Sequence, residues 1–163
     1  MKRILAVAIV SLAASTSAFA QSATATATAS VTFVSPLSIT KTADLNFGSI
    51  IAGPAGGGIT IDPDGGQYPN SVVVLPGGYS NAQFAVSGVP NSSYSIVLPV
   101  SAIVSNGDSA YDLVAVDFTS LPSGTGTLSA DGTQTLGVGA TMHITHAQVP
   151  GNYSGTFDVT VMY

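Results

Sequence analysis

The sequence TFDVTVMY at residues 156–163 ends the chain and decides its fold class. Phe157 and every second residue after it are large and apolar, and Asp, Thr and Met stand between them. A period of two is typical of a β-strand with one buried face, because successive side chains of a strand point to opposite sides of the sheet. Residues 23–33, near the other end, show the same period, with Thr or Ser between apolar residues.

Short segments of this kind recur between the two ends and predict an all-β sandwich or barrel. They are rich in Val, Ile, Thr, Tyr and Phe, and groups of Gly, Pro, Asn and Asp separate them. Besides residues 23–34, the expected strands are 37–40, 45–50, 58–61, 71–75, 82–86, 94–98, 113–118, 133–138, 142–145 and 153–163. The side chains expected in the core are Phe47, Phe84, Tyr94, Phe118, Phe157 and Val159.

The first 20 residues have the features of a secretory signal peptide. Lys2 and Arg3 precede an apolar run at 4–14, and Ala18-Phe19-Ala20 forms a cleavage signal before Gln21. The run is shorter than the ~20 residues that span a bilayer, and no later apolar run reaches that length. We therefore expect export to the periplasm, cell surface or medium. The expected parts are a signal peptide at 1–20, an Ala/Thr-rich arm or strand at 21–35 and one β-sandwich domain at 36–163.

The charge of the chain excludes several classes of partner. Lys41 is the only basic side chain after residue 20, and the chain has no Glu and no Cys. Nucleic acids and anionic membranes bind proteins through Lys and Arg, so neither is an expected partner. Without Cys, no disulfide can stabilise the fold in an oxidising compartment.

The sequence contains no convincing motif for catalysis, a cofactor or a metal. His143 and His146 are three residues apart, so in a strand they point to opposite faces and cannot share one ion. Asp62-Pro63-Asp64-Gly65 resembles part of a calcium loop, but an EF-hand loop ends in a bidentate Glu. There is no Gly-x-Ser-x-Gly elbow, and no Lys-Ser/Thr follows the glycines at 53–58. We expect no catalytic, cofactor-binding or metal-binding residues, and no enzyme.

Four motifs carry a resemblance to a known family. They are PLSI at 36–39, DLNFG at 44–48, AQFAVSG at 82–88 and GNYSGTFDVTV at 151–161. With the Ala-rich start, they make residues 23–163 similar to the secreted bacterial family called domain of unknown function 4402. These motifs are strand patterns, so the resemblance identifies a family and no chemistry.

A second likeness is to spore coat protein U and the chaperone–usher pilins, which also combine an early x-Phe-Gly strand with a Gly-x-Tyr…Val-x-Val ending. It implies an immunoglobulin-like, pilin-like antiparallel β-sandwich whose N-terminal extension adds a strand to a neighbour. The implied partners are other copies, other surface subunits and a periplasmic chaperone. This chain lacks the cysteines of those pilins, and its extension carries mainly Ala, so Val31 and Phe33 are the strong anchors.

These observations lead to a partner-strand hypothesis and to open alternatives. The inward residues of a donated strand would be Ala25, Ala27, Ala29, Val31 and Phe33. The same segment fits an edge strand of its own domain, a free arm, or amyloid-like stacking. The expected function is a structural or cell-surface protein, in one form a fimbria subunit. The alternative is a monomeric surface or periplasmic binding module, for example for a glycan bound on tyrosines, and an enzyme is the third possibility.

Overall fold

The computed structural model describes residues 21–146 and 148–163. The expected signal peptide, residues 1–20, lies outside the described residues. The chain divides into an N-terminal unit that ends at Thr32 and a domain, Phe33–Tyr163, and each is treated separately below. The domain is all-β, as predicted, and its sheets are antiparallel, as in a β-sandwich. Its strands are β1 (Ser38–Ala43), β2 (Ile50–Ile51), β3 (Gly57–Ile61), β4 (Gln67–Asn70), β5 (Val73–Val74), β6 (Ala82–Ser87), β7 (Ser93–Val97), β8 (Ser101–Val104), β9 (Leu113–Leu121), β10 (Thr125–Thr127), β11 (Thr133–Ile144) and β12 (Thr160–Met162), with a 3-10 turn at Ser109–Tyr111.

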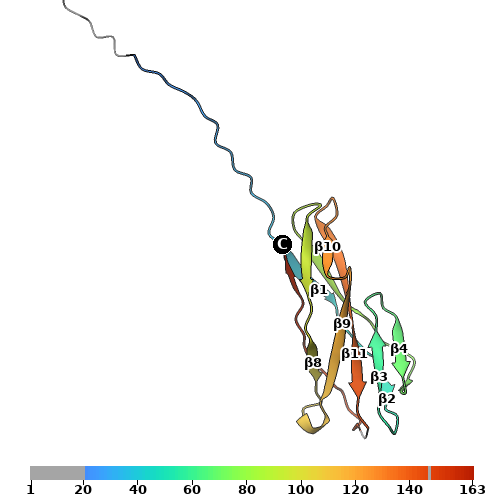
Figure 1. The fold of residues 1–163 in the computed structure, drawn as a ribbon. Helices are drawn as coiled ribbons and strands as arrows, with labels where there is room; N and C mark the ends of the chain where they lie inside the picture. Colours follow the sequence, from blue (N-terminus) through green and yellow to red (C-terminus); the bar gives the residue numbers. More distant parts are fainter. Residues whose placement is uncertain (1–20, 147) are drawn as a thin grey trace, which may run out of the picture. The chain divides into compact units, whose positions relative to one another are not determined.

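Strand β11 is the centre of the main sheet. It pairs with β6 and then β3 along one edge, and with β9 along the other (Figure 1). Its even-numbered residues from Leu136 to Ile144 are buried, as the alternation requires. We expected a break at 139–141, and this boundary is wrong. Gly139 lies within the strand. Glycine is required at this position, since a Cβ atom there would collide with the backbone of Ile61 and Asp62.

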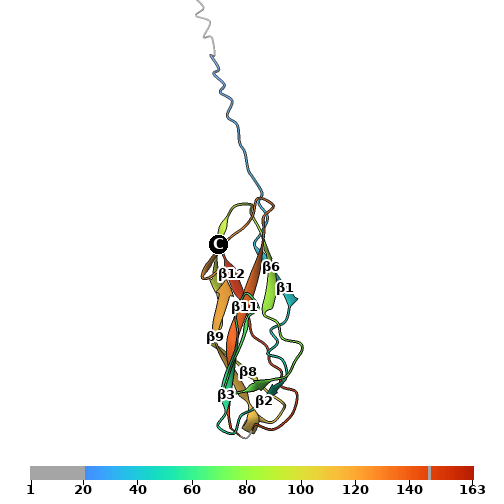
Figure 2. The same ribbon diagram turned by 90° about the vertical axis from the view of Figure 1, so that its right-hand side faces the viewer.

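Three sheets make up the domain. The largest has the order β1-β6-β11-β3-β4, and β9 and β8 continue it from the other edge of β11. A second sheet has the order β10-β7-β12, and β2 pairs with β5 in a third. Strands β1 and β12 are therefore edge strands of two different sheets, and a few of their residues come close together. Figure 2 shows both strands in the half of the domain that carries the end of the chain, with β6 drawn between them in that view.

The core consists of two clusters of buried side chains. One gathers around Ile59 and Met142, and the other around Tyr94 and Leu136. Three partly buried residues, Leu45, Phe118 and Phe157, pack against both clusters. The rings of Phe118 and Phe157 have centroids 4.9 Å apart. The two clusters are thus joined by a few large side chains that remain partly open to solvent.

The expected core is correct in its contacts but only partly in its burial. Tyr94 is 1% exposed. The other five residues pack against the clusters but are only half-buried: Phe47, Phe84, Phe118, Phe157 and Val159.

Two expected strands form only at their ends. Residues 45–50 contribute a single bridge, Asn46 to Ser80, before β2 begins. Residues 153–163 contribute one bridge at Ser154 and then only β12. Both segments have the alternation of a strand, but no strand lies alongside most of their length to complete the ladder.

Candidate functional site

The N-terminal arm, residues 21–33, is the first candidate. None of its residues belongs to a strand, helix or turn, and every one is exposed. The partner-strand residues Ala25, Ala27 and Ala29 are therefore exposed, and so are the two anchors. Val31 is 77% exposed and Phe33 is 91% exposed. Adjacent large apolar side chains left open to solvent are typical of a surface that binds another protein.

The arm has the physical properties of an unpaired strand. It contains no charge, no Gly and no Pro, so nothing in it opposes β-pairing. As a β-strand, residues 23–33 would extend over about 36 Å at ~3.3 Å per residue. Its odd-numbered face is apolar and its even-numbered face is Thr and Ser. One face therefore suits a protein interior and the other suits water.

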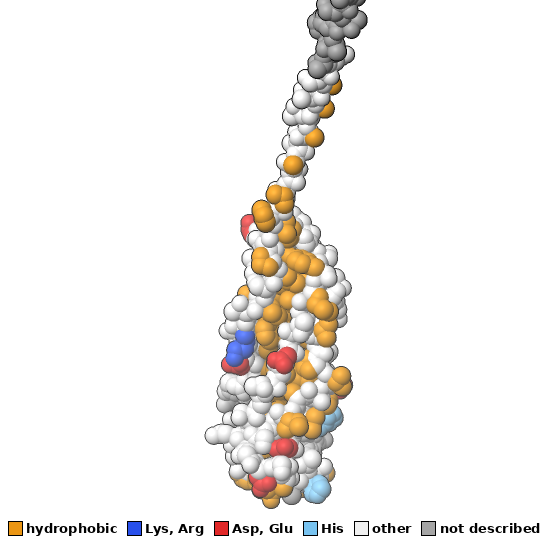
Figure 3. All heavy atoms as spheres, turned by 90° about the vertical axis from the view of Figure 1, so that its left-hand side faces the viewer, with side chains coloured by type: hydrophobic (Ala, Val, Ile, Leu, Met, Phe, Trp, Pro, Cys, Tyr) orange, Lys and Arg blue, Asp and Glu red, His pale blue; other side chains and the backbone are white. Residues whose placement is uncertain are grey.

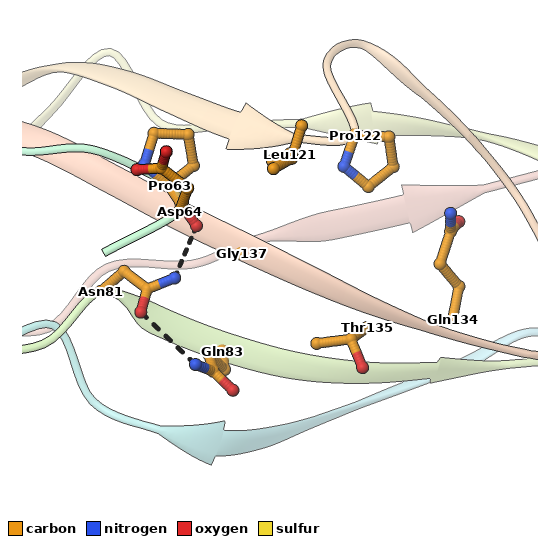
Figure 4. Close-up of a pocket in the computed structure, with 9 residues that line it drawn as sticks. All are labelled: Pro63, Asp64, Asn81, Gln83, Leu121, Pro122, Gln134, Thr135 and Gly137. Carbon is orange, nitrogen blue, oxygen red and sulfur yellow. Dashed lines mark hydrogen bonds between the residues drawn. The ribbon is translucent and has the colours of Figure 1, made fainter. Parts of the chain in front are cut away.

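A polar depression on the domain is the second candidate. It has a volume of about 580 Å³ and is open to solvent. Figure 4 shows its lining: Pro63, Asp64, Asn81, Gln83, Leu121, Pro122, Gln134, Thr135 and Gly137. Sequence reasoning missed this site, although the amides of β6 and β11 at outward positions were the available signal.

Most amide groups of the depression already have partners within the domain. The Asn81 side chain donates to the Pro63 carbonyl oxygen at 2.5 Å and accepts from Gln83 at 3.4 Å. The Tyr94 hydroxyl donates to Gln134 Oε1 at 2.8 Å, and burial raises the pKa of Tyr94. The bond from Asn81 to Pro63 ties the 62–66 turn to the sheet, and the other two bonds orient the side chains of Gln83 and Gln134.

The tyrosines do not form a sugar-binding platform in this depression. Tyr68 and Tyr79 are exposed, but neither lines it. Tyr94 is buried in the core and only its hydroxyl reaches Gln134. Stacking of a sugar ring on an aromatic face is therefore not available there.

The titratable side chains that the sequence singled out do not converge. His143 lies on β11 and His146 beyond its end, and both are exposed. Asp64 accepts a hydrogen bond from the backbone nitrogen of Gly66 at 3.2 Å, as expected of a tight turn. Among the described residues, no group of three or more His, Asp or Glu is placed to hold a metal ion. Nor does this part of the chain form a helix long and apolar enough to cross a membrane.

Comparison with known proteins identifies one family. The family described as Domain of unknown function (DUF4402) matches residues 37–163, which include every strand of the domain. No curated protein and no solved structure matches the chain.

Proposed function

This chain belongs to the family Domain of unknown function (DUF4402), whose name assigns no activity, and we propose that the protein is an exported structural subunit of the cell surface that assembles by β-strand addition. The exposed, alternating arm is the single observation that carries this proposal. In it, residues 23–33 of one copy pair with the sheet edge of another. When the rotation between copies does not close a ring, repetition of such a head-to-tail contact builds an open, fimbria-like fibre.

The expected energetics favour the arm as an anchor. Full burial of Val31 and of Phe33 would contribute about 1.5–3 kcal/mol each. Each main-chain hydrogen bond along the strand would add about 0.5–1.5 kcal/mol. Alanine methyl groups add little area, but they let the backbone approach a partner closely. The ladder and the two anchors are the interactions that would oppose the cost of ordering the arm, about 1–2 kcal/mol per residue.

Export is the second part of the proposal. Lys2 and Arg3, the apolar run and Ala18-Phe19-Ala20 support it. The partners that fit an exported strand donor are other copies, other surface subunits and a periplasmic chaperone that covers the apolar residues before assembly.

A matched pair of variants tests the proposal in the exported chain, residues 21–163. Val31→Asp with Phe33→Asp places two charges on the apolar face of the arm, and Ser30→Asp with Thr32→Asp places two charges on the polar face. Size-exclusion chromatography with light scattering over a concentration series should show multimers for the wild type and the polar-face variant, and monomers for the apolar-face variant. A wild type that stays monomeric at high concentration would refute the proposal.

A second candidate is a monomeric binding module, and the polar depression of Figure 4 favours it. Its amides and Asp64 are groups that can hydrogen-bond to sugar hydroxyls. A glycan array probed with the monomeric chain tests it, because saturable binding lost in Gln134→Ala would support this function.

A further inference from the structure

The domain contains a large apolar groove that the proposed function does not by itself explain. The groove lies between two walls, residues 44–52 and residues 148–157, and has a volume of about 1230 Å³. Small-molecule sites usually measure about 300–1,000 Å³. On one face of the domain, hydrophobic side chains gather in a long band (Figure 3). The size of the groove fits an extended segment of polypeptide better than a small ligand.

The groove walls are the two segments that fail to form full strands. Residues 44–49 continue from β1 and make one bridge, from Asn46 to Ser80. Residues 155–159 lead into β12 and belong to no strand. Strands β1 and β12 are edges of different sheets and come close to each other, and the groove opens beyond that contact, between the segment that follows β1 and the segment that precedes β12. The carbonyl oxygens of Asp44, Asn46, Phe47 and Ser49 already accept hydrogen bonds within the domain. An added strand would pair with the remaining backbone groups of this wall and with residues 155–159.

The side chains of the groove are those of an incomplete core. Phe47, Phe84, Phe118 and Phe157 all line it, and all are half-buried. The other lining residues include small ones, such as Ala102 and Ala115. Small residues and half-buried rings leave room for side chains supplied from outside.

The arm fits this groove in length, pattern and charge. The 44–52 wall would extend over about 30 Å as a strand, and residues 23–33 over about 36 Å. Lys41 and Asp44 are the only charged residues of the lining, and they form an ion pair with each other, so the groove offers no free charge to a ligand. An arm without charges is complementary to such a groove.

A tight turn within the same chain would restrict the register of the arm. If residues 35–37 turned the arm back onto β1, Phe33 would lie opposite Ile39 and Val31 opposite Lys41. Both anchors would then lie beside β1, and only Val31 would come near the groove, at Lys41 on its margin. An arm from another chain has no such restriction on its register.

We infer that the groove between residues 44–52 and 148–157 receives residues 23–33 of a second copy of this chain, with Val31 and Phe33 packed among Phe47, Phe118 and Phe157. This inference rests on the proposed function and adds the receiving site. The donated strand would fill the space between the two walls and cover the half-buried rings that pack against both core clusters.

Crosslinking in the full exported chain tests the receiving site. Because the described residues contain no native cysteine, only the introduced cysteines can react there. One chain carries Thr32→Cys in the arm. Its partner carries Ser49→Cys or Thr156→Cys, which are exposed on the two walls, or the control Thr135→Cys in the polar depression. After mixing, a short bismaleimide should join Thr32→Cys to either wall position and not to Thr135→Cys. Crosslinks to Thr135→Cys, or none to either wall, would overturn the assignment.

A filled groove provides an independent readout. Ala115→Phe places a ring in the groove, and Ala85→Phe adds the same ring at an exposed position of β6 outside it. Light scattering should show that Ala115→Phe abolishes multimers while Ala85→Phe retains them, with circular dichroism confirming that both fold. If Ala115→Phe is folded and still multimeric, the groove is not the receiving site. Multimers that require Val31 and Phe33 but still form in Ala115→Phe would refute the receiving site and agree with the proposed function. The absence of wild-type multimers would refute both the receiving site and the proposed function.

Discussion

Replacing Phe157 with Ala tests how the groove and the core depend on each other. Phe157 packs against both clusters and makes a tilted ring contact with Phe118, with a centroid distance of 4.9 Å. A fully buried Phe→Ala change costs about 3–5 kcal/mol. In the isolated domain Phe157 is only half-buried, so about half of that, roughly 1.5–2.5 kcal/mol, is the expected loss in a monomer. A donated strand would bury the rest of the ring, and the cost should then approach the full value.

The assay is urea unfolding of Phe157→Ala in two backgrounds. One is the monomeric Val31→Asp/Phe33→Asp chain, and the other is the wild-type multimer at a fixed concentration. Leu136→Ala, at a fully buried site that does not itself line the groove, is the control, and it should cost about 2–5 kcal/mol equally in both backgrounds. An equal cost of Phe157→Ala in both backgrounds would refute the reasoning, since the arm would then add no cover to the ring.

Three further predictions concern the domain alone. Gly137→Ala should destabilise it by about 1–3 kcal/mol in urea unfolding, because a Cβ atom there would collide with the Pro63 carbonyl oxygen, and an unchanged midpoint would place the 62–66 turn elsewhere. Because burial raises the pKa of Tyr94 above 10.0, stability should be complete below pH 10 and fall as the pH rises beyond it. In Tyr94→Phe this contribution to the alkaline loss should be missing, so an identical alkaline profile would contradict it. Thermal melts with excess EDTA, calcium or zinc should coincide, and a midpoint several degrees higher with one ion would reveal a metal site.

The strand class of the fold was predictable because alternation is a local property. Leu136 and Val138 alternate with smaller residues, and the structure buries both of them. Strand β10 was missed because it has three residues, with a Gly between two Thr, and strand β8 was missed because its four residues are too few to show an alternation. Strand β4 was missed because it contains Pro69, which a sheet tolerates only at an edge.

The sequence predicted the arm of the candidate site but not the groove that would receive it. Alternation shows which face of residues 23–33 is apolar, but it does not show whether the partner strand lies in the same chain or in another. It also overpredicted the ladders of residues 45–50 and 153–163, because pairing depends on a neighbouring strand that the local pattern does not contain. Phe47 and Phe157 are half-buried for the same reason: the segments that carry them have no neighbouring strand along most of their length. The local sequence pattern does not contain this information.

Hydrogen exchange of the arm is the most direct measurement of strand donation. Mass spectrometry after brief deuterium labelling compares peptides covering residues 23–33 in the wild-type multimer and in the Val31→Asp/Phe33→Asp monomer. The account predicts that the arm amides exchange at once in the monomer and are protected in the multimer, because a donated strand hydrogen-bonds along its length. Peptides from the 44–52 wall should gain protection in the same sample. Arm amides that exchange at the unprotected rate in a multimer would contradict strand donation.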